Sequence, residues 1–92
     1  MLEIRFTARM RRDFKRMEKR GKDMSKLGAV LRLLVSRQTL PPQYRDHQLK
    51  GSMKEFRECH LEPDWLFVYR IIEDKAILSA FRTGTHSDLF NE

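Results

Sequence analysis

The sequence ECHLEPDWLFVYR, residues 58–70, predicts the centre of the fold. Within it, residues 66–69 are an unbroken apolar run of strand formers, which predicts a central strand covered on both faces. The preceding Glu62-Pro63-Asp64 predicts a turn, because proline presets φ and aspartate tolerates turn geometry. Residues 56–60 alternate in character and predict a second strand, antiparallel to the first. The turn end of the resulting hairpin carries His60, Asp64 and Trp65.

The chain before this hairpin predicts a strand and two helices. Residues 2–6 alternate and predict a short strand. Thr7 is a candidate N-cap for a helix that ends near Gly21, and Asp23 is a candidate N-cap for a second helix over residues 24–37. The expected buried stripes are Met10, Phe14 and Met17 in the first helix, and Leu27, Val30, Leu31, Leu34 and Val35 in the second. The short link between them predicts an antiparallel helical hairpin.

The remaining segments complete a sheet. Pro41-Pro42 opens a loop, and residues 46–51 predict a short strand that ends in a glycine turn. A polar turn at residues 73–75 leads into a last strand over residues 76–83, and residues 84–90 predict one helical turn. The order β-α-α-β-β-β-β predicts one α+β domain over residues 1–92, with an antiparallel sheet and the N-terminal helical hairpin on one face.

Composition limits the classes of protein that the chain can represent. It has 92 residues, 40% of them hydrophobic and 35% charged, as expected of a small globular domain. No apolar run reaches the length of a membrane span, and the N-terminus lacks the apolar core of a secretory signal. Cys59 is the single cysteine, which excludes an internal disulfide, fits a cytoplasmic protein and predicts a small core residue.

The net charge of +6 is unevenly distributed. Residues 4–37 contain twelve Lys or Arg and three acidic residues, a local net charge of +9. Such a basic half is typical of a protein that binds a polyanion, either nucleic acid or an acidic protein segment, although a solvated helix face explains the charge equally well. If the half binds a polyanion, reversing the charges of Arg11, Arg12, Lys15 and Arg16 is expected to weaken that binding.

The candidate chemical groups are the three histidines, His47, His60 and His86, which lie at strand ends or beside turns. There is no His-x-x-x-His pair and no Cys-x-x-Cys, so the sequence predicts neither a metal site nor a cofactor, and it lacks a glycine-rich phosphate loop and a serine nucleophile elbow. Imidazoles are the natural acid–base groups near neutral pH, and Asp64 can orient one of them. Each histidine alone is more often an ordinary surface residue, so the hypothesis depends on their convergence at one end of the sheet.

A basic domain with clustered histidines is suited to cleaving RNA without a metal. One histidine activates the ribose 2′-hydroxyl, and another protonates the leaving 5′-oxygen. Arg82 or a helix cation can stabilise the phosphorane, and Trp65 and Phe90 can stack on bases. For Trp65, a half-buried core aromatic is an equally good interpretation.

Three motifs in this order resemble the YafQ family of RelE-superfamily toxins. They are DHQLKGS at residues 46–52, CHLEPDWL at residues 59–66 and FRTGTHSDLF at residues 81–90, with KDMSKL at residues 22–27 adding to the likeness. The resemblance covers nearly the whole chain. It implies a compact α+β fold of the RelE and microbial-RNase type, and the toxin half of a type II toxin–antitoxin pair.

The resemblance also implies an activity, a site and partners. The activity is endonucleolytic cleavage of messenger RNA in the ribosomal A site, and the partners are the ribosome with its RNA and a cognate antitoxin of the DinJ/RelB type. The implied acid–base cluster consists of His47, His60, Asp64 and His86, with His86 as proton donor and Phe90 positioning substrate. The general base is either His47 or His60. Two alternatives from other classes are a non-catalytic inhibitor of DNA gyrase, as in the related ParE-type toxins, and an RNA-binding module without cleavage.

Overall fold

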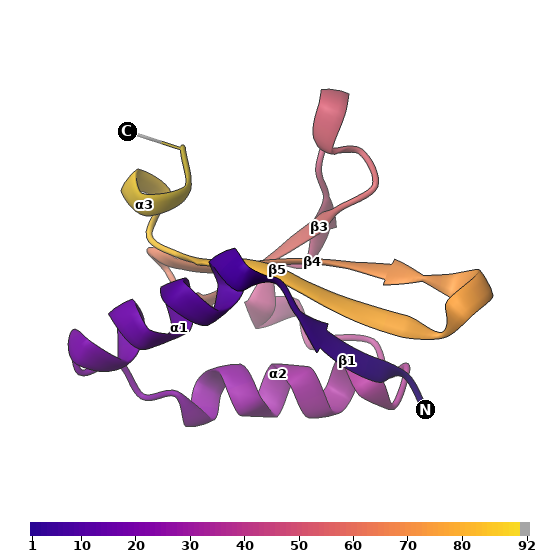
Figure 1. The fold of residues 1–92 in the computed structure, drawn as a ribbon, viewed down its shortest axis with the longest axis horizontal. Coiled ribbons are helices and arrows are strands. Elements are labelled where there is room, and N and C mark those ends of the chain that lie inside the picture. Colours follow the sequence, from indigo (N-terminus) through magenta and orange to yellow (C-terminus); the bar gives the residue numbers. More distant parts are fainter. Residues whose placement is uncertain (91–92) are drawn as a thin grey trace.

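A computed structural model describes residues 1–90 as a five-stranded sheet with helices on one face and a short helix at one end (Figure 1). The strands are β1 (Glu3–Phe6), β2 (His47–Gln48), β3 (Arg57–Glu62), β4 (Trp65–Ile72) and β5 (Ile77–Gly84). The helices are α1 (Ala8–Lys19), α2 (Ser25–Val35) and α3 (His86–Phe90), with single 3-10 turns at Pro42–Tyr44, Gly51–Met53 and Glu73–Lys75. The predicted α+β class and element order are confirmed, and the last two residues of the predicted domain lie outside the described residues.

The strands are ordered β1-β5-β4-β3-β2, so the apolar strand β4 is central, as predicted. Strands β2 to β5 pair antiparallel in succession, whereas β1 runs parallel to β5. The predicted antiparallel sheet therefore holds for four strands, and the sheet as a whole is mixed. A parallel pair needs a long connection, which the two helices and the intervening strands supply.

The predicted cap of α1 is confirmed, because the hydroxyl of Thr7 accepts the backbone N–H of Met10 at 3.0 Å. The N-cap residue of α2 is Met24, which makes no side-chain cap hydrogen bond, so the prediction of Asp23 at this position is wrong by one residue. The carboxylate of Asp23 still accepts the backbone N–H of Ser25 at 3.0 Å. Helix α1 packs against β5 and α2 against β3, so the two helices together cover one face of the sheet. None of the helices within residues 1–90 is long and apolar enough to cross a membrane.

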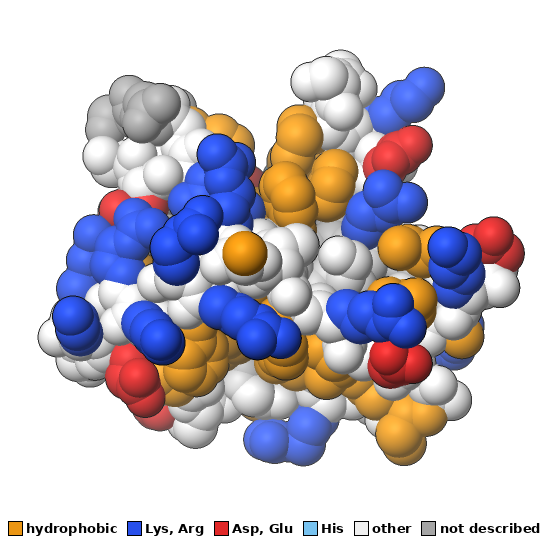
Figure 2. Space-filling view, viewed as in Figure 1, with side chains coloured by type: hydrophobic (Ala, Val, Ile, Leu, Met, Phe, Trp, Pro, Cys, Tyr) orange, Lys and Arg blue, Asp and Glu red, His pale blue; other side chains and the backbone are white. Residues whose placement is uncertain are grey.

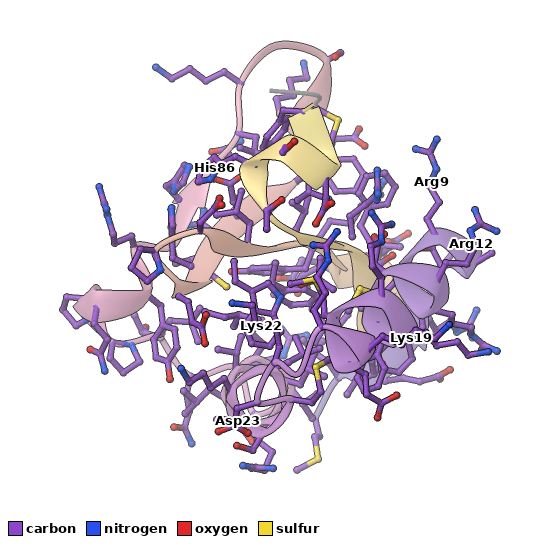
Figure 3. All side chains as sticks on the ribbon, turned by 90° about the vertical axis from the view of Figure 1, so that its left-hand side faces the viewer. Arg9, Arg12, Lys19, Lys22, Asp23 and His86 are labelled. Carbon is purple, nitrogen blue, oxygen red and sulfur yellow. The ribbon has the colours of Figure 1, made fainter. Side chains whose placement is uncertain are left out.

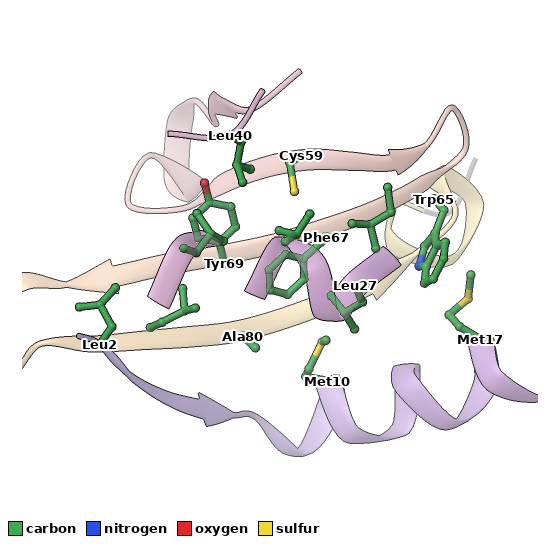
Figure 4. Close-up of a cluster of buried hydrophobic side chains, with 14 residues drawn as sticks. Leu2, Met10, Met17, Leu27, Leu40, Cys59, Trp65, Phe67, Tyr69 and Ala80 are labelled. Carbon is green, nitrogen blue, oxygen red and sulfur yellow. The ribbon is translucent and has the colours of Figure 1, made fainter. Parts of the chain in front are cut away.

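The core lies between this helical layer and the sheet (Figure 4). The fully buried side chains of the predicted stripes are those of Met10, Met17, Leu27 and Val30, and Leu34 is 5% exposed. They pack against side chains from β3, β4 and β5 that include Cys59, Trp65, Phe67, Tyr69 and Ala80. Because side chains alternate along a strand, Glu58 and His60 of β3 face away from the helices.

Trp65 belongs to this core, and the prediction that it contacts substrate is wrong. Its side chain has 0% exposure, and its indole Nε1–H donates to the hydroxyl of Thr83 at 2.9 Å. Stacking on a base requires an accessible ring face, which Trp65 does not offer without opening the core. The alternative interpretation as a core aromatic describes it better, although it is fully rather than half buried.

Candidate active site

The three histidines lie in a row on the side of β3 that faces away from the helices. His47 comes from β2, His60 from β3 and His86 from the first position of α3. The ring centroids of His47 and His60 are 6.3 Å apart, and those of His60 and His86 are 6.1 Å apart. His60 is therefore the middle histidine, with another imidazole ring close by on each side.

His47 is held by both ring nitrogens. Nδ1 lies 2.8 Å from the carbonyl oxygen of Arg45, and since a carbonyl only accepts, Nδ1 carries a proton. Nε2 lies 3.4 Å from Oε1 of Glu58, which pairs with His47 across the β2–β3 ladder and is 8% exposed at its side chain. Sequence reasoning missed Glu58; the signal was its position two residues before His60 on the same strand, which places both side chains on one face.

His60 has a different environment. Its Nδ1 is buried and makes no hydrogen bond to any other described residue. Burial is the main cause that lowers the pKa of His60 below its ordinary value of 6.5; the charges of Arg45, His47 and His86 lower it too, and Glu58 opposes them. His60 is consequently neutral at neutral pH, with a lone pair available to accept a proton.

His86 is bound to the carboxylate of Asp64, which the β3–β4 turn presents. The Nδ1 of His86 lies 2.6 Å from Oδ1 of Asp64, and the backbone N–H of His86 donates to the same oxygen at 3.0 Å. These two hydrogen bonds, the backbone one first, lower the pKa of Asp64. An ionised carboxylate accepts, so the Nδ1 proton is held by Asp64 and the proton available for transfer is on Nε2.

Phe90 and Arg82 lie at the α3 end of this face. The ring of Phe90 is 44% exposed and its centroid is 6.5 Å from that of His86, so it is accessible for stacking. The guanidinium of Arg82 instead donates to both carboxylate oxygens of Asp13, at 2.8 and 3.0 Å. Hydrogen bonding to Asp13 raises the pKa of Arg82. The carboxylate of Asp13 also offsets part of the positive charge of Arg82, which is expected from the sequence to stabilise the phosphorane.

Asp13 is a second residue that sequence reasoning missed. It is 1% exposed and also accepts the backbone N–H of Thr83, at 3.2 Å, on the edge of β5 that β1 leaves unpaired after Phe6. Arg16 adds a further donor at 2.7 Å. The signal was the helical spacing, because residue 13 lies three positions after Met10 on the buried face of α1.

Cations line the side of the molecule next to the site. Lys and Arg side chains gather over α1 (Figure 2), and Arg9, Arg12 and Lys19 project into solvent from it (Figure 3). Within residues 1–90, no group of three His, Cys, Asp or Glu side chains is arranged to hold a metal ion. The side chains that converge at the site are acid–base groups: a neutral imidazole beside a second imidazole whose Nδ1 is held by a carboxylate, next to a basic surface.

Known proteins share both the sequence and the fold. The family model for the bacterial toxin of type II toxin–antitoxin system, YafQ, matches residues 2–91. The mRNA interferase toxin YafQ of Escherichia coli strain K12 is 40% identical over 89 residues, which are 96% of this chain and 95% of that protein. A metal-bound toxin from Helicobacter pylori superposes with a TM-score of 0.93 at 44% identity, over 98% of this chain and 100% of that one. YafQ in the E. coli DinJ–YafQ complex superposes with a TM-score of 0.89 at 38% identity, over 98% and 99% of the two chains.

The fold and the matched length define the class first: the protein is a toxin of a bacterial type II toxin–antitoxin system, with a RelE-like fold. Within that class, the chain belongs to the YafQ toxin family.

Proposed function

We propose that the protein is an endoribonuclease that cleaves messenger RNA in the A site of the ribosome and so inhibits translation. Family membership supports the enzyme class, since two relatives from E. coli carry the name mRNA interferase toxin YafQ. One observation supports the mechanism: the ring centroids of His60 and His86 lie 6.1 Å apart, and the carboxylate of Asp64 orients His86. Base and acid at this separation can stand on the two sides of one phosphodiester group.

The proposed reaction is a transesterification followed by release. His60 accepts the proton of the ribose 2′-hydroxyl, and the 2′-oxygen attacks the adjacent phosphorus. His86 donates its Nε2 proton to the 5′-oxygen as the P–O bond breaks, leaving a 2′,3′-cyclic phosphate and a 5′-hydroxyl. Asp64 stabilises the protonated imidazole before transfer. Phe90 stacks on a base of the substrate, and Arg82 and the cations of α1 oppose the charge of the phosphorane.

His47 has a supporting role in this proposal. Both of its ring nitrogens are engaged, Nδ1 by the carbonyl of Arg45 and Nε2 by Glu58, whereas His60 is neutral and lacks such partners among residues 1–90. We therefore assign the role of general base to His60 rather than to His47. The contact with Glu58 then holds His47 beside His60.

The partners proposed for the protein are the translating ribosome and an acidic antitoxin. The basic surface over α1 suits ribosomal RNA. The antitoxin is expected to be of the DinJ/RelB type, since DinJ is the partner of the E. coli relative. Both partners place the reaction in the cytoplasm, and residues 1–92 act as one domain in it.

Replacing the acid tests the function. Inducing the wild-type chain in a bacterial host is expected to arrest growth and to produce messenger RNA cuts in frame with the codons, as mapped by primer extension. His86→Ala is expected to lose at least about 100-fold in cleavage, as for removal of a general acid, while keeping the fold and the affinity for the antitoxin. Growth arrest by both proteins without any cuts contradicts the proposal and favours an inhibitor, for example of DNA gyrase.

The chemistry has its own test with purified ribosomes. Cleavage is expected to continue in EDTA and to stop when the nucleotide at the cut carries a 2′-deoxyribose, because the attacking oxygen is then missing. Cleavage of the 2′-deoxy substrate, or a requirement for added metal, is incompatible with the mechanism.

A further inference from the structure

Two sets of ion pairs tie one corner of the molecule to the two segments that carry Asp64 and His86. The corner is the chain between α1 and α2, residues 20–26, and Figure 3 shows it below the start of α3, with Lys22 and His86 labelled. It provides cations to an acidic residue in each segment. One acidic residue is Asp88 in α3 and the other is Glu62 in the β3–β4 turn.

The tether to α3 is well defined. Arg20 donates to both carboxylate oxygens of Asp88 at 2.7 and 3.0 Å, and Arg16 approaches the same carboxylate at 3.3 Å. Asp88 is 11% exposed at its side chain, so the pair is partly removed from water. The same carboxylate accepts the backbone N–H of Thr85 at 2.9 Å, and the hydroxyl of Thr85 accepts that of Asp88 at 3.1 Å. Asp88 thus has two roles: it caps the first turn of α3, and it attaches α3 to the end of α1 through Arg20.

The tether to the turn uses two lysines. Lys22 and Lys26 each lie 2.8 Å from a different oxygen of Glu62, two residues before Asp64. The strand register shifts between His60 and Glu62, so the turn is not held by a regular ladder on this side.

The pair of Asp64 and His86 lies on an exposed part of the surface. The side chains of Asp64 and His86 are 66% and 41% exposed. Helix α3 has five residues, too few to be stable by itself in water. The corner adds ion pairs to an acidic residue on each side of this exposed pair.

We infer that Asp88, through Arg20, and Glu62, through Lys22 and Lys26, are positioning residues that hold His86 and Asp64 in reacting geometry. The inference deepens the proposed function and rests on it for its effect on cleavage. Neither residue touches the reacting atoms. Loss of either tether leaves the core packed, because neither Asp88 nor Glu62 belongs to the buried core, but it allows the acid to move away from the carboxylate that orients it.

The test compares Asp88→Asn, Asp88→Glu and Arg20→Gln with Asp23→Asn as matched control. Asp23 is an exposed acid of the same corner whose carboxylate hydrogen-bonds Ser25. Single-turnover cleavage of ribosome-bound mRNA is expected to slow about tenfold in Asp88→Asn with little change in KM, because small misplacements cost rate rather than binding. Arg20→Gln is expected to give the same loss, the double variant no more than either single, and Asp88→Glu most of the wild-type rate.

A second readout reports on His86 without substrate. Imidazole NMR of the free toxin is expected to show the Nδ1 proton of His86 protected from solvent exchange in the wild type and in Asp23→Asn. In Asp88→Asn, Arg20→Gln and Glu62→Gln this protection is expected to fall while the melting temperature stays within a few degrees.

The outcomes separate the two hypotheses. Unchanged protection and unchanged rate in both Asp88→Asn and Arg20→Gln overturn the positioning role, and so does loss of rate without any change at His86. If Asp88→Asn does not fold, the cleavage rate and the His86 protection of Arg20→Gln alone decide whether the positioning role holds. If the wild type cuts no RNA, the proposed function fails, and the NMR comparison still decides whether the corner positions His86.

Discussion

The histidines of the site differ in what engages their ring nitrogens. The Nδ1 of His86 is bound to a carboxylate and that of His47 to a backbone carbonyl, whereas the Nδ1 of His60 is buried with no hydrogen-bond partner among the described residues. A carboxylate favours the protonated form of an imidazole, and burial favours the neutral form. At the scale of single residues, environment alone therefore assigns different roles to chemically identical side chains.

The lowered pKa of His60 has a consequence for the pH dependence of cleavage. A base works only above its own pKa, so the acidic limb of the single-turnover rate is expected below pH 6.5, the ordinary histidine value. The lowered pKa of His60 also affects the free energy of unfolding. Its contribution to stability is fully present above the pKa of His60 in the unfolded chain, and it is lost as the pH falls through the lower pKa of His60 in the folded protein. Rates measured from about pH 5 to 8, with an NMR titration of His60, check this expectation. An acidic limb at or above pH 6.5 that persists in His60→Gln contradicts His60 as the base.

At the scale of elements, the site depends on how α3 leaves β5. Gly84 ends the strand, and a Cβ placed on it would lie 2.9 Å from the Cβ of Asp88. Because Asp88 is tied to α1, it has little freedom to give way. The direct passage from strand to helix is what brings His86 back beside the β3–β4 turn.

Two glycine variants form a matched pair for this element. Gly84→Ala is expected to displace α3, lowering stability by about 1–3 kcal/mol as in overpacking and lowering cleavage by about tenfold. Gly28→Ala, in the interior of α2, meets only the guanidinium of Arg32 at 3.5 Å, and is expected to stabilise by about 0.5–1 kcal/mol with cleavage unchanged. Chemical denaturation and the cleavage assay measure both. Wild-type cleavage in Gly84→Ala would show that α3 tolerates displacement.

At the scale of the whole molecule, charge and chemistry occupy adjoining surfaces. The exposed cations of α1 include Arg9, Arg12 and Lys19, whereas Arg16 pairs with the buried Asp13 and with Asp88. The charge reversal expected from the sequence included Arg16 among the surface cations; the structure shows that reversing it would disrupt the attachment of α3 as well. A test of ribosome binding should therefore leave Arg16 intact.

The alanine variant at Arg9, Arg12 and Lys19 is expected to weaken ribosome binding and to reduce the slope of log K against log salt by about 2 to 3, since each phosphate contact contributes about one. The control carries alanine at Arg32, Arg37 and Lys75, an equal charge change at the end of α2 and the β4–β5 tip. Sedimentation with ribosomes at several salt concentrations measures both. Equal slopes for the two variants would show that net charge, rather than the α1 surface, drives binding.

The elements and their order follow from local patterns in the sequence. Hydrophobic periodicity, caps and turn residues act over a few neighbouring positions, so the stripes of α1 and α2, the Thr7 cap and the central strand β4 could be read from the chain. Four features became visible only in the folded molecule: the parallel pairing of β1, the burial of Trp65, the ion pair of Arg82 with Asp13, and the ion pairs of Asp88 and Glu62 with the α1–α2 corner. Each of these depends on contacts between residues far apart in the chain, whose geometry is set by packing rather than by local preference.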